Sequence, residues 1–215
     1  MSTFDQTTVE RIYQKWAKVY DWLTPAYLFG NEKRLRKETI DSLRLQPGQM
    51  VLDIACGTGR NFPLILEKIG PSGKLVAVDY TSAMLARARE QIEREGWKNV
   101  ELIQGDVTRI GLGQKFDAAL CTLAMSVIPN YRVALDRMMA HVKPGGWMAI
   151  GDGKRSSLWY GRPFNWLADL SAYGAAAEVA FRRPWESLQE IVGDFHYDEW
   201  FSGFFYVAWS EAQNT

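Results

Sequence analysis

The sequence predicts an α/β fold: a doubly wound, mostly parallel sheet of seven strands with helices on both faces. Two patterns support this prediction. Short apolar runs alternate with segments of helical periodicity over residues 50–153, which is typical of parallel βαβ units. Residues 195–211 resemble two aromatic strands that meet at Ser202-Gly203, so the last pair should be an antiparallel hairpin.

The first 45 residues are expected to form a helical cap on this sheet. Apolar side chains recur at helical spacing over 7–23, and Pro25 should end that helix because the residue before a proline avoids helical angles. A second helix is expected over 32–42. We interpret the mixed charges between Glu32 and Arg44 as a solvated face.

Strands and helices should then alternate up to the hairpin. The strands are expected over 50–55, 74–80, 100–106, 115–123 and 147–153. The helices are expected over 61–69, 82–95 and 134–142, and residues 143–146 (KPGG) should form a turn. Residues 154–185 break the alternation. They are predicted to be an insertion that forms a lid within a single domain of residues 1–215.

Composition narrows the function classes. Lysine plus arginine and aspartate plus glutamate both number 25, so the formal net charge is zero and we expect no nucleic-acid partner. Cys56 and Cys121 form no CxxC pair, and with His141 and His196 they give no metal-ligand pattern, so no metal is expected. No signal peptide or membrane-spanning run is evident, which favours the cytoplasm. No pattern indicates an oligomeric state.

A glycine loop follows the first expected strand, in the sequence VLDIACGTGRN (51–61). Ligands of parallel α/β sheets bind beyond the carboxyl ends of the strands, so this loop is the expected site. A dinucleotide-binding loop would need a third glycine where Phe62 stands, and no Gly-Lys-Ser/Thr follows as in a P-loop. Asp53, just before the loop, disfavours a phosphate and suits a cation.

Acids also end the next two expected strands. A carboxylate at Asp79 can accept both hydroxyls of a ribose, and the neighbourhood of Asp106 can accept an adenine amino group. Together with Asp53 they describe a ligand with a cationic end, a ribose and an adenine, and without phosphate. S-adenosyl-L-methionine has those parts and is the expected cofactor.

The segments VLDIACGTG (51–59), AVDYTSAML (77–85), GDV (105–107) and KPGG resemble, in order and spacing, the motifs of class I S-adenosylmethionine-dependent methyltransferases. The resemblance covers about residues 10–153. It implies the strand order 3-2-1-4-5-7-6 with an antiparallel seventh strand.

This resemblance implies how the cofactor is held. The glycine loop would contact its methionine end, Tyr80 and Met84 would flank the adenine, and the end of the fourth strand would face the methyl group and the acceptor. The cofactor-binding residues expected from the acids and the resemblance together are Tyr20, Asp53, Ala55, Gly57, Thr58, Gly59, Asn61, Asp79, Tyr80, Met84, Gly105, Asp106, Val107, Thr122 and Leu123.

Two segments bear on the methyl acceptor. Residues 18–30 (KVYDWLTPAYLFG) resemble the quinone-biosynthesis C-methyltransferases and the small bacterial phospholipid N-methyltransferases, and by that resemblance Tyr20 would act near the sulfonium as a catalytic side chain. The lid combines aromatic rings with arginines, which suits an amphiphilic acceptor and a peripheral contact with an anionic membrane at its inner face. The acceptor-binding residues expected are Tyr27, Arg155, Tyr160, Trp166 and Tyr173.

The main expectation is N-methylation of an amine headgroup on a phospholipid or another amphiphile. A water-poor pocket favours a neutral amine nucleophile, so a strong base is optional. A carbon acceptor would need a base near a phenol, and neither His141 nor His196 shows an acidic partner in the sequence; both are expected to be structural. The alternatives are C-methylation in quinone biosynthesis, methylation of a soluble small molecule and a non-catalytic cofactor-binding module, with a nicotinamide dehydrogenase more distant.

Overall fold

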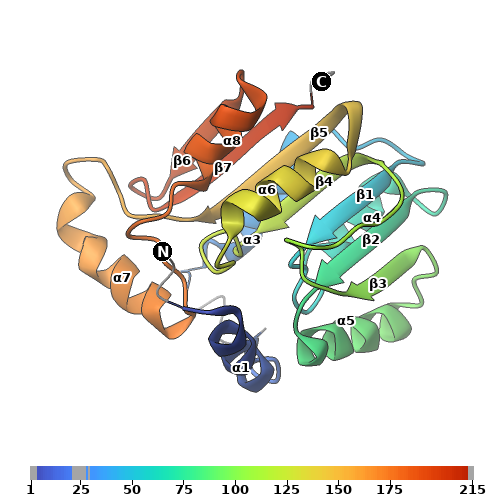
Figure 1. Cartoon of the computed structure of the whole chain (residues 1–215), viewed down its shortest axis with the longest axis horizontal. Helices are drawn as coiled ribbons and strands as arrows, with labels where there is room; N and C mark the ends of the chain where they lie inside the picture. Colours follow the sequence, from blue (N-terminus) through green and yellow to red (C-terminus); the bar gives the residue numbers. More distant parts are fainter. Residues whose placement is uncertain (1–3, 21–27, 29, 213–215) are drawn as a thin grey trace.

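The computed structural model describes residues 4–20, 28 and 30–212. Over these residues, seven strands form one sheet in the order β3-β2-β1-β4-β5-β7-β6, which confirms the expected fold class (Figure 1). Strand β7 runs antiparallel to both β5 and β6, and the other neighbours are parallel. The strands are β1 (Met50–Ile54), β2 (Lys74–Asp79), β3 (Val100–Gln104), β4 (Phe116–Thr122), β5 (Val142–Gly153), β6 (His196–Trp200) and β7 (Phe205–Glu211).

Helices cover both faces of this sheet. Helices α3, α4 and α5 pack on one face, and α6 and α8 pack on the other. Because side chains alternate along a strand, Val51 of β1 joins the first layer and its neighbour Leu52 joins the second. The helices are α1 (Gln6–Trp16), α3 (Glu32–Ser42), α4 (Phe62–Ile69), α5 (Ser82–Glu95), α6 (Tyr131–Ala140), α7 (Asn165–Gly174) and α8 (Pro184–Val192), with a 3-10 turn η1 (Arg162–Phe164).

Helix α4 shows how the local sequence produces these elements. Proline occupies its first turn, where a missing N–H costs nothing, and Gly70 ends it with a φ of 64°. The side chains that it buries recur at helical spacing and face the sheet; they are Phe62, Ile65, Leu66 and Ile69.

Three predicted elements differ from the structure. The helix expected over 7–23 ends at Trp16, a turn follows over 17–19, and the expected stop at Pro25 lies outside the described residues. The helix expected over 134–142 is displaced towards the N-terminus, as α6. Residues 143–146, expected as a turn, belong to β5, because the pairing of β4 with β5 continues through a register shift.

The charges of α3 are not all solvated, contrary to expectation. Lys33, Arg34 and Lys37 are exposed, but Glu32 and Arg36 are buried. These two positions lie three and four residues from apolar ones, so the helical period turns them towards the sheet. The prediction was wrong because it treated the charges as one run and did not assign them to faces of the helix.

Helices α1 and α7 lie beyond the ends at which the parallel strands finish (Figure 1). The Tyr13 hydroxyl of α1 donates to the carbonyl of Ala175, just after α7, at 3.2 Å. The two helices therefore enclose space at the edge where ligands of such sheets bind. In the part of the chain that the structure describes, no helix combines the length and apolarity needed to cross a membrane.

Candidate functional site

Two adjoining cavities lie at the carboxyl edge of the sheet. The first, of about 80 Å³, lies over the ends of β1, β2 and β4. The second, of about 310 Å³, lies between the end of β5, the hairpin and α7. Among the residues that the structure describes, four line both cavities: Tyr13, Tyr20, Leu123 and Val127. We call the first the cofactor cavity and the second the acceptor cavity.

Most of the expected cofactor-binding residues line the first cavity. They are Tyr20, Ala55, Gly57, Thr58, Asp79, Tyr80, Met84, Asp106, Val107, Thr122 and Leu123. Four others, Asp53, Gly59, Asn61 and Gly105, do not line it. A Cβ on Gly59 would lie 2.6 Å from the Phe62 ring, and one on Gly105 would lie 3.0 Å from Ile110, so these two glycines serve packing.

Asp53 contacts a protein side chain and not the cavity. It is fully buried, and the Asn61 amide donates to both of its carboxylate oxygens at 3.1 Å. Burial raises the pKa of Asp53 to about 7, against the lowering effect of the Asn61 hydrogen bond and of Arg36. This differs from the expectation that Asp53 faces the cationic end of the ligand.

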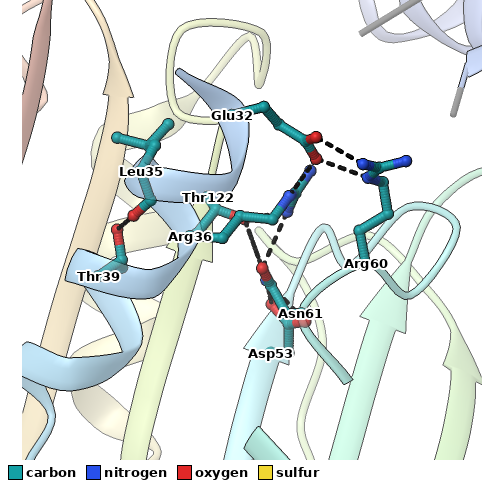
Figure 2. A network of polar contacts seen from close by, with 8 residues as sticks. All are labelled: Glu32, Leu35, Arg36, Thr39, Asp53, Arg60, Asn61 and Thr122. Atoms are coloured by element: carbon teal, nitrogen blue, oxygen red, sulfur yellow. Dashed lines mark hydrogen bonds and ion pairs between the residues drawn. The ribbon is translucent and has the colours of Figure 1, made fainter. Parts of the chain in front are cut away.

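The charged side chain that lines the cofactor cavity beside Asn61 is Arg36, which the sequence reasoning missed (Figure 2). Its Nη1 donates to Asn61 Oδ1 at 2.9 Å and to Thr122 Oγ1 at 2.7 Å. Its Nε donates to Glu32 at 2.6 Å. Among the described residues, Nη2 has no acceptor, so this nitrogen is available to a ligand.

Glu32 holds Arg36 in place and is itself held by a second arginine (Figure 2). Arg60 donates to both carboxylate oxygens of Glu32 at 2.6 Å. Burial raises the pKa of Glu32, but the two guanidinium groups outweigh burial and keep it below its ordinary value. The signal in the sequence was the Glu32–Arg36 pair, four residues apart on the apolar face of a helix.

Asp79 ties the glycine loop to the second strand. Its Oδ2 accepts from the Gly57 N–H and its Oδ1 from the Thr81 N–H, both at 2.8 Å. Burial raises the pKa of this carboxyl despite those hydrogen bonds. Asp106 is partly buried, and its Oδ1 accepts from the N–H and the hydroxyl of Thr108. Each carboxylate also lines the cavity and retains lone pairs for a ligand.

Two residues at this edge have unusual backbone angles. Ala55 follows β1 with a φ of 53°, and Leu123 follows β4 with a φ of 58°. This region is unfavourable for residues other than glycine, and such strain is common at ligand sites. Both residues line the cofactor cavity, and Leu123 also lines the acceptor cavity.

The acceptor cavity is mostly apolar, and its described lining includes one buried carboxylate, that of Asp152 at the end of β5. Its Oδ2 accepts from the Ser126 N–H at 2.8 Å, and its Oδ1 from the Ser126 hydroxyl at 3.1 Å and the Gly153 N–H at 2.7 Å. Burial raises the pKa of Asp152 to about 6 against these hydrogen bonds. An acid at the end of a parallel strand marks Asp152 in the sequence as it marks Asp79.

A cationic side chain in the same cavity is neutralised. Lys154 is buried, and its ammonium donates to the Tyr197 hydroxyl at 2.7 Å and to Glu199. It also lies over the Trp185 ring at 5.1 Å. Lys154 therefore balances Glu199, whereas Asp152 is held mainly by neutral donors.

Of the expected acceptor-binding residues, Tyr27 lies outside the described residues, and the four others do not line the acceptor cavity. Tyr160, Trp166 and Tyr173 are exposed, and Arg155 pairs with Asp169 at 3.6 Å. The cavity is lined by Leu167, Ala168 and Ala172, which lie on the opposite face of α7. The helical period places the large aromatic residues and the lining residues on different faces.

The comparisons with known proteins agree with this geometry. Residues 51–146 match the family model described as "Methyltransferase domain". A demethylmenaquinone methyltransferase from Listeria welshimeri is 30% identical over 159 residues, which cover 74% of this chain and 67% of that relative. The chain belongs to the S-adenosylmethionine-dependent methyltransferases. Its cofactor is S-adenosylmethionine.

Solved structures share the fold of this methyltransferase. A SAM-dependent methyltransferase from Aquifex aeolicus is 20% identical, with a TM-score of 0.62 over 98% of this chain and 100% of that one. The N-methyltransferase NodS from Bradyrhizobium japonicum is 16% identical, with a TM-score of 0.59 over 88% of this chain and 98% of that one. At these identities the likeness concerns the fold.

The cofactor cavity of this methyltransferase fits S-adenosylmethionine chemically. Arg36 is a donor for a carboxylate, and Asp79 is an acceptor for hydroxyl groups. Met84, Val107 and Ile128 supply apolar surface for a planar base.

The two histidines make structural contacts in this methyltransferase, as expected. His141 is buried; its Nδ1 lies 2.7 Å from the Arg137 carbonyl and its Nε2 accepts from the Leu112 N–H at 3.1 Å. His196 stacks on Trp209 with ring centres 5.2 Å apart. Neither histidine lines the two cavities.

Proposed function

We propose that this methyltransferase transfers the methyl group to a ring carbon of a phenolic amphiphile, as a quinone-biosynthesis C-methyltransferase does. The observation that carries the proposal is Asp152, a buried carboxylate on the wall of a mostly apolar cavity next to the cofactor cavity. Relatives named as demethylmenaquinone methyltransferases support it. They favour C-methylation over the expected N-methylation of a phospholipid headgroup.

A carboxylate at this position suits a phenol better than an amine. An amine acceptor must be neutral to react, and a carboxylate within a few ångströms would stabilise its ammonium form. A phenol has the opposite requirement, because a nearby carboxylate can accept the hydroxyl proton and make the ring carbon a better nucleophile. Asp152 therefore opposes methylation of an amine and promotes methylation of a phenol at its ring carbon.

The chain's own residues would act in sequence on such an acceptor. S-adenosylmethionine, when bound, supplies an electrophilic methyl group. Asp152 would accept the hydroxyl proton while the Ser126 N–H and hydroxyl hold its carboxylate in place. The ring carbon would bond to the methyl carbon as the methyl–sulfur bond breaks and S-adenosylhomocysteine is left. The proton on that ring carbon would then pass to water, and the oxygen would regain the proton held by Asp152, which restores the aromatic ring. Tyr20 and Leu123, which line both cavities, would align the ring carbon with the methyl group.

Within the cofactor cavity we assign the carboxylate of S-adenosylmethionine to Arg36 and the ribose hydroxyls to Asp79. The Nη2 of Arg36, which has no acceptor among the described residues, supports the first assignment, since a guanidinium binds a carboxylate through charge-assisted hydrogen bonds. Asp79 supports the second, because both of its oxygens keep acceptor capacity after binding the Gly57 and Thr81 N–H groups.

The test offers S-adenosylmethionine with a labelled methyl group and two acceptors in separate detergent solutions. One is a demethylmenaquinone kept in its reduced, dihydroxy form, and the other is phosphatidylethanolamine. Label in the naphthalene ring carbon is expected, and the Asp152→Asn variant should lose that label while still binding S-adenosylhomocysteine. Label in the phospholipid alone would overturn the proposal in favour of N-methylation.

A further inference from the structure

Several large apolar side chains of the lid are exposed. Five of them are more than 45% exposed within a stretch of 15 residues and do not line the acceptor cavity; they are Trp159, Tyr160, Trp166, Leu170 and Tyr173. We call these five residues the lid face. Isolated apolar residues are normal on a surface, but a contiguous group of aromatic residues indicates a binding surface.

Helix α7 is apolar on two opposite faces. Leu167, Ala168 and Ala172 line the acceptor cavity, whereas Trp166, Leu170 and Tyr173 are 61%, 67% and 72% exposed. These three outer residues lie four and three positions apart, so they form one stripe along the helix. A surface helix normally places polar residues on that side. One layer of helix therefore separates the acceptor cavity from an exposed apolar surface.

The charges around the lid face are mainly positive. Arg155 and Arg162 are exposed, and Asp169, which pairs with Arg155, is the one acid between residues 155 and 173. Helix α1 packs beside the end of α7, where the Phe4 and Tyr173 rings lie 6.0 Å apart. Its C-terminal part and the turn that follows it add three exposed basic residues and no acid between residues 11 and 18; they are Arg11, Lys15 and Lys18. This excess occurs in a chain whose formal net charge is zero.

We propose that the lid face docks on the surface of an anionic lipid bilayer, with Trp166, Leu170 and Tyr173 inserted between headgroups. Tryptophan and tyrosine favour the interface because their rings are apolar with one polar edge, and basic residues beside them are attracted to anionic headgroups. A protein partner would not require this combination of amphipathic rings and surrounding cations.

This docking has a consequence for the acceptor. With its outer face on the bilayer, α7 would bring the wall of the acceptor cavity to the depth of the headgroups. An acceptor with a lipid tail would then enter from the membrane without crossing water. The docking itself does not depend on which atom is methylated, so it can be tested apart from the proposed function.

The experiment is vesicle flotation of the whole chain without any acceptor. Phosphatidylcholine vesicles are compared with vesicles that also contain phosphatidylglycerol. The wild type is expected to float with the anionic vesicles and to bind the neutral ones less. The variant Trp166→Ser/Leu170→Ser/Tyr173→Ser should lose at least about tenfold in partition coefficient, since burial of even one such side chain is worth about that factor.

Two further variants complete the test. Val133→Ser removes an exposed apolar side chain from α6, away from the lid, and should bind like the wild type. Arg162→Gln/Lys18→Gln should weaken binding to the anionic vesicles and leave the neutral ones unchanged. Binding of S-adenosylhomocysteine by calorimetry shows that each variant is folded.

Two outcomes would overturn the proposal. Wild type that floats with neither kind of vesicle, or a triple variant that floats as well as the wild type, excludes docking through this face. A dimer in light scattering that the triple variant abolishes, without vesicle binding by the wild type, would assign the lid face to contact between two copies of the chain.

Discussion

The cofactor cavity and the acceptor cavity share a wall but differ in chemistry and in origin. Charged and polar groups line the first, namely Asp79 and Asp106 near the strand ends and Arg36 from α3. Apolar side chains from the lid, the hairpin and α1 line the second, with Asp152 as its buried acid. The difference shows that residues near the strand ends can form most of a site for a polar ligand. A cavity for an apolar acceptor is instead assembled from segments that lie far apart in the chain.

Asp53 and Asp152 are both buried acids, but they differ in their position relative to the two cavities. Burial raises the pKa of Asp53 and of Asp152, to about 7 and about 6 respectively. Asp53 binds the Asn61 amide behind the glycine loop, while Asp152 faces the acceptor cavity. A raised pKa alone therefore does not identify the reactive acid; its position relative to a cavity does.

The largest expected effect comes from removing the acid of the acceptor cavity. Asp152→Asn should lower kcat by about 10²–10⁴-fold, the usual contribution of general acid–base catalysis, and leave the affinity for S-adenosylhomocysteine unchanged. In the wild type, kcat should fall as pH drops through about 6, because the protonated form of Asp152 accepts no proton. The variant should lack this acidic limb. Steady-state kinetics over pH measure both.

Ser126→Ala serves as its milder control, since it removes the hydroxyl donor to Asp152 but keeps the backbone donor. It should reduce kcat less than Asp152→Asn does. Equal activity of Asp152→Asn and wild type would exclude Asp152 as the base.

The second-largest expected effect concerns the cofactor cavity. Arg36→Met should weaken S-adenosylhomocysteine binding by about 10- to 100-fold, because it removes charge-assisted hydrogen bonds to a carboxylate. Arg60→Met is the matched control: Arg60 pairs with the same Glu32 but lines neither cavity. Calorimetry measures both affinities. An equal loss in the two variants would mean that Arg36 acts through Glu32 and not through the ligand.

The smallest expected effect is the difference between alanine substitutions at the two glycines of the loop. Both have positive φ, 58° at Gly57 and 85° at Gly59, so alanine costs about 1–2 kcal/mol of backbone energy at either position. Gly59→Ala should lose about 1–3 kcal/mol more stability, because its Cβ would overlap the Phe62 ring, whereas a Cβ on Gly57 meets nothing within 4 Å.

Gly57→Ala should instead weaken S-adenosylhomocysteine binding more, since Gly57 lines the cofactor cavity. Urea unfolding and calorimetry distinguish the two effects. The interpretation fails if Gly57→Ala is the less stable variant or if it binds as the wild type does.

Much of the fold follows from short stretches of sequence. Apolar runs such as 51–54 and 75–78 alternate with helices, and parallel strands bring their carboxyl ends to one edge. Asp79 and Asp106 therefore had to lie near the glycine loop, because Asp79 is the last residue of β2 and Asp106 follows β3 by two residues. The resemblance to methyltransferases added the order of the strands, which local patterns leave open.

The acceptor site was predicted less well. The aromatic and basic side chains of the lid suggested the acceptor-binding residues, but Tyr160, Trp166 and Tyr173 face outward. Composition shows that a segment is apolar, and only packing decides which face of α7 meets the cavity. Asp152 was not predicted as a base because the search for one considered histidines.

By itself, then, the sequence determined the α/β class, the glycine loop and the acids at the strand ends, because each depends on residues close together in the chain. Only the tertiary structure decided that Arg36 meets Thr122 and that Asp152 meets Ser126, contacts between residues 86 and 26 positions apart. It also decided which side of α7 faces the acceptor cavity. Such contacts depend on how helices pack over the sheet edge, and no local period encodes that packing.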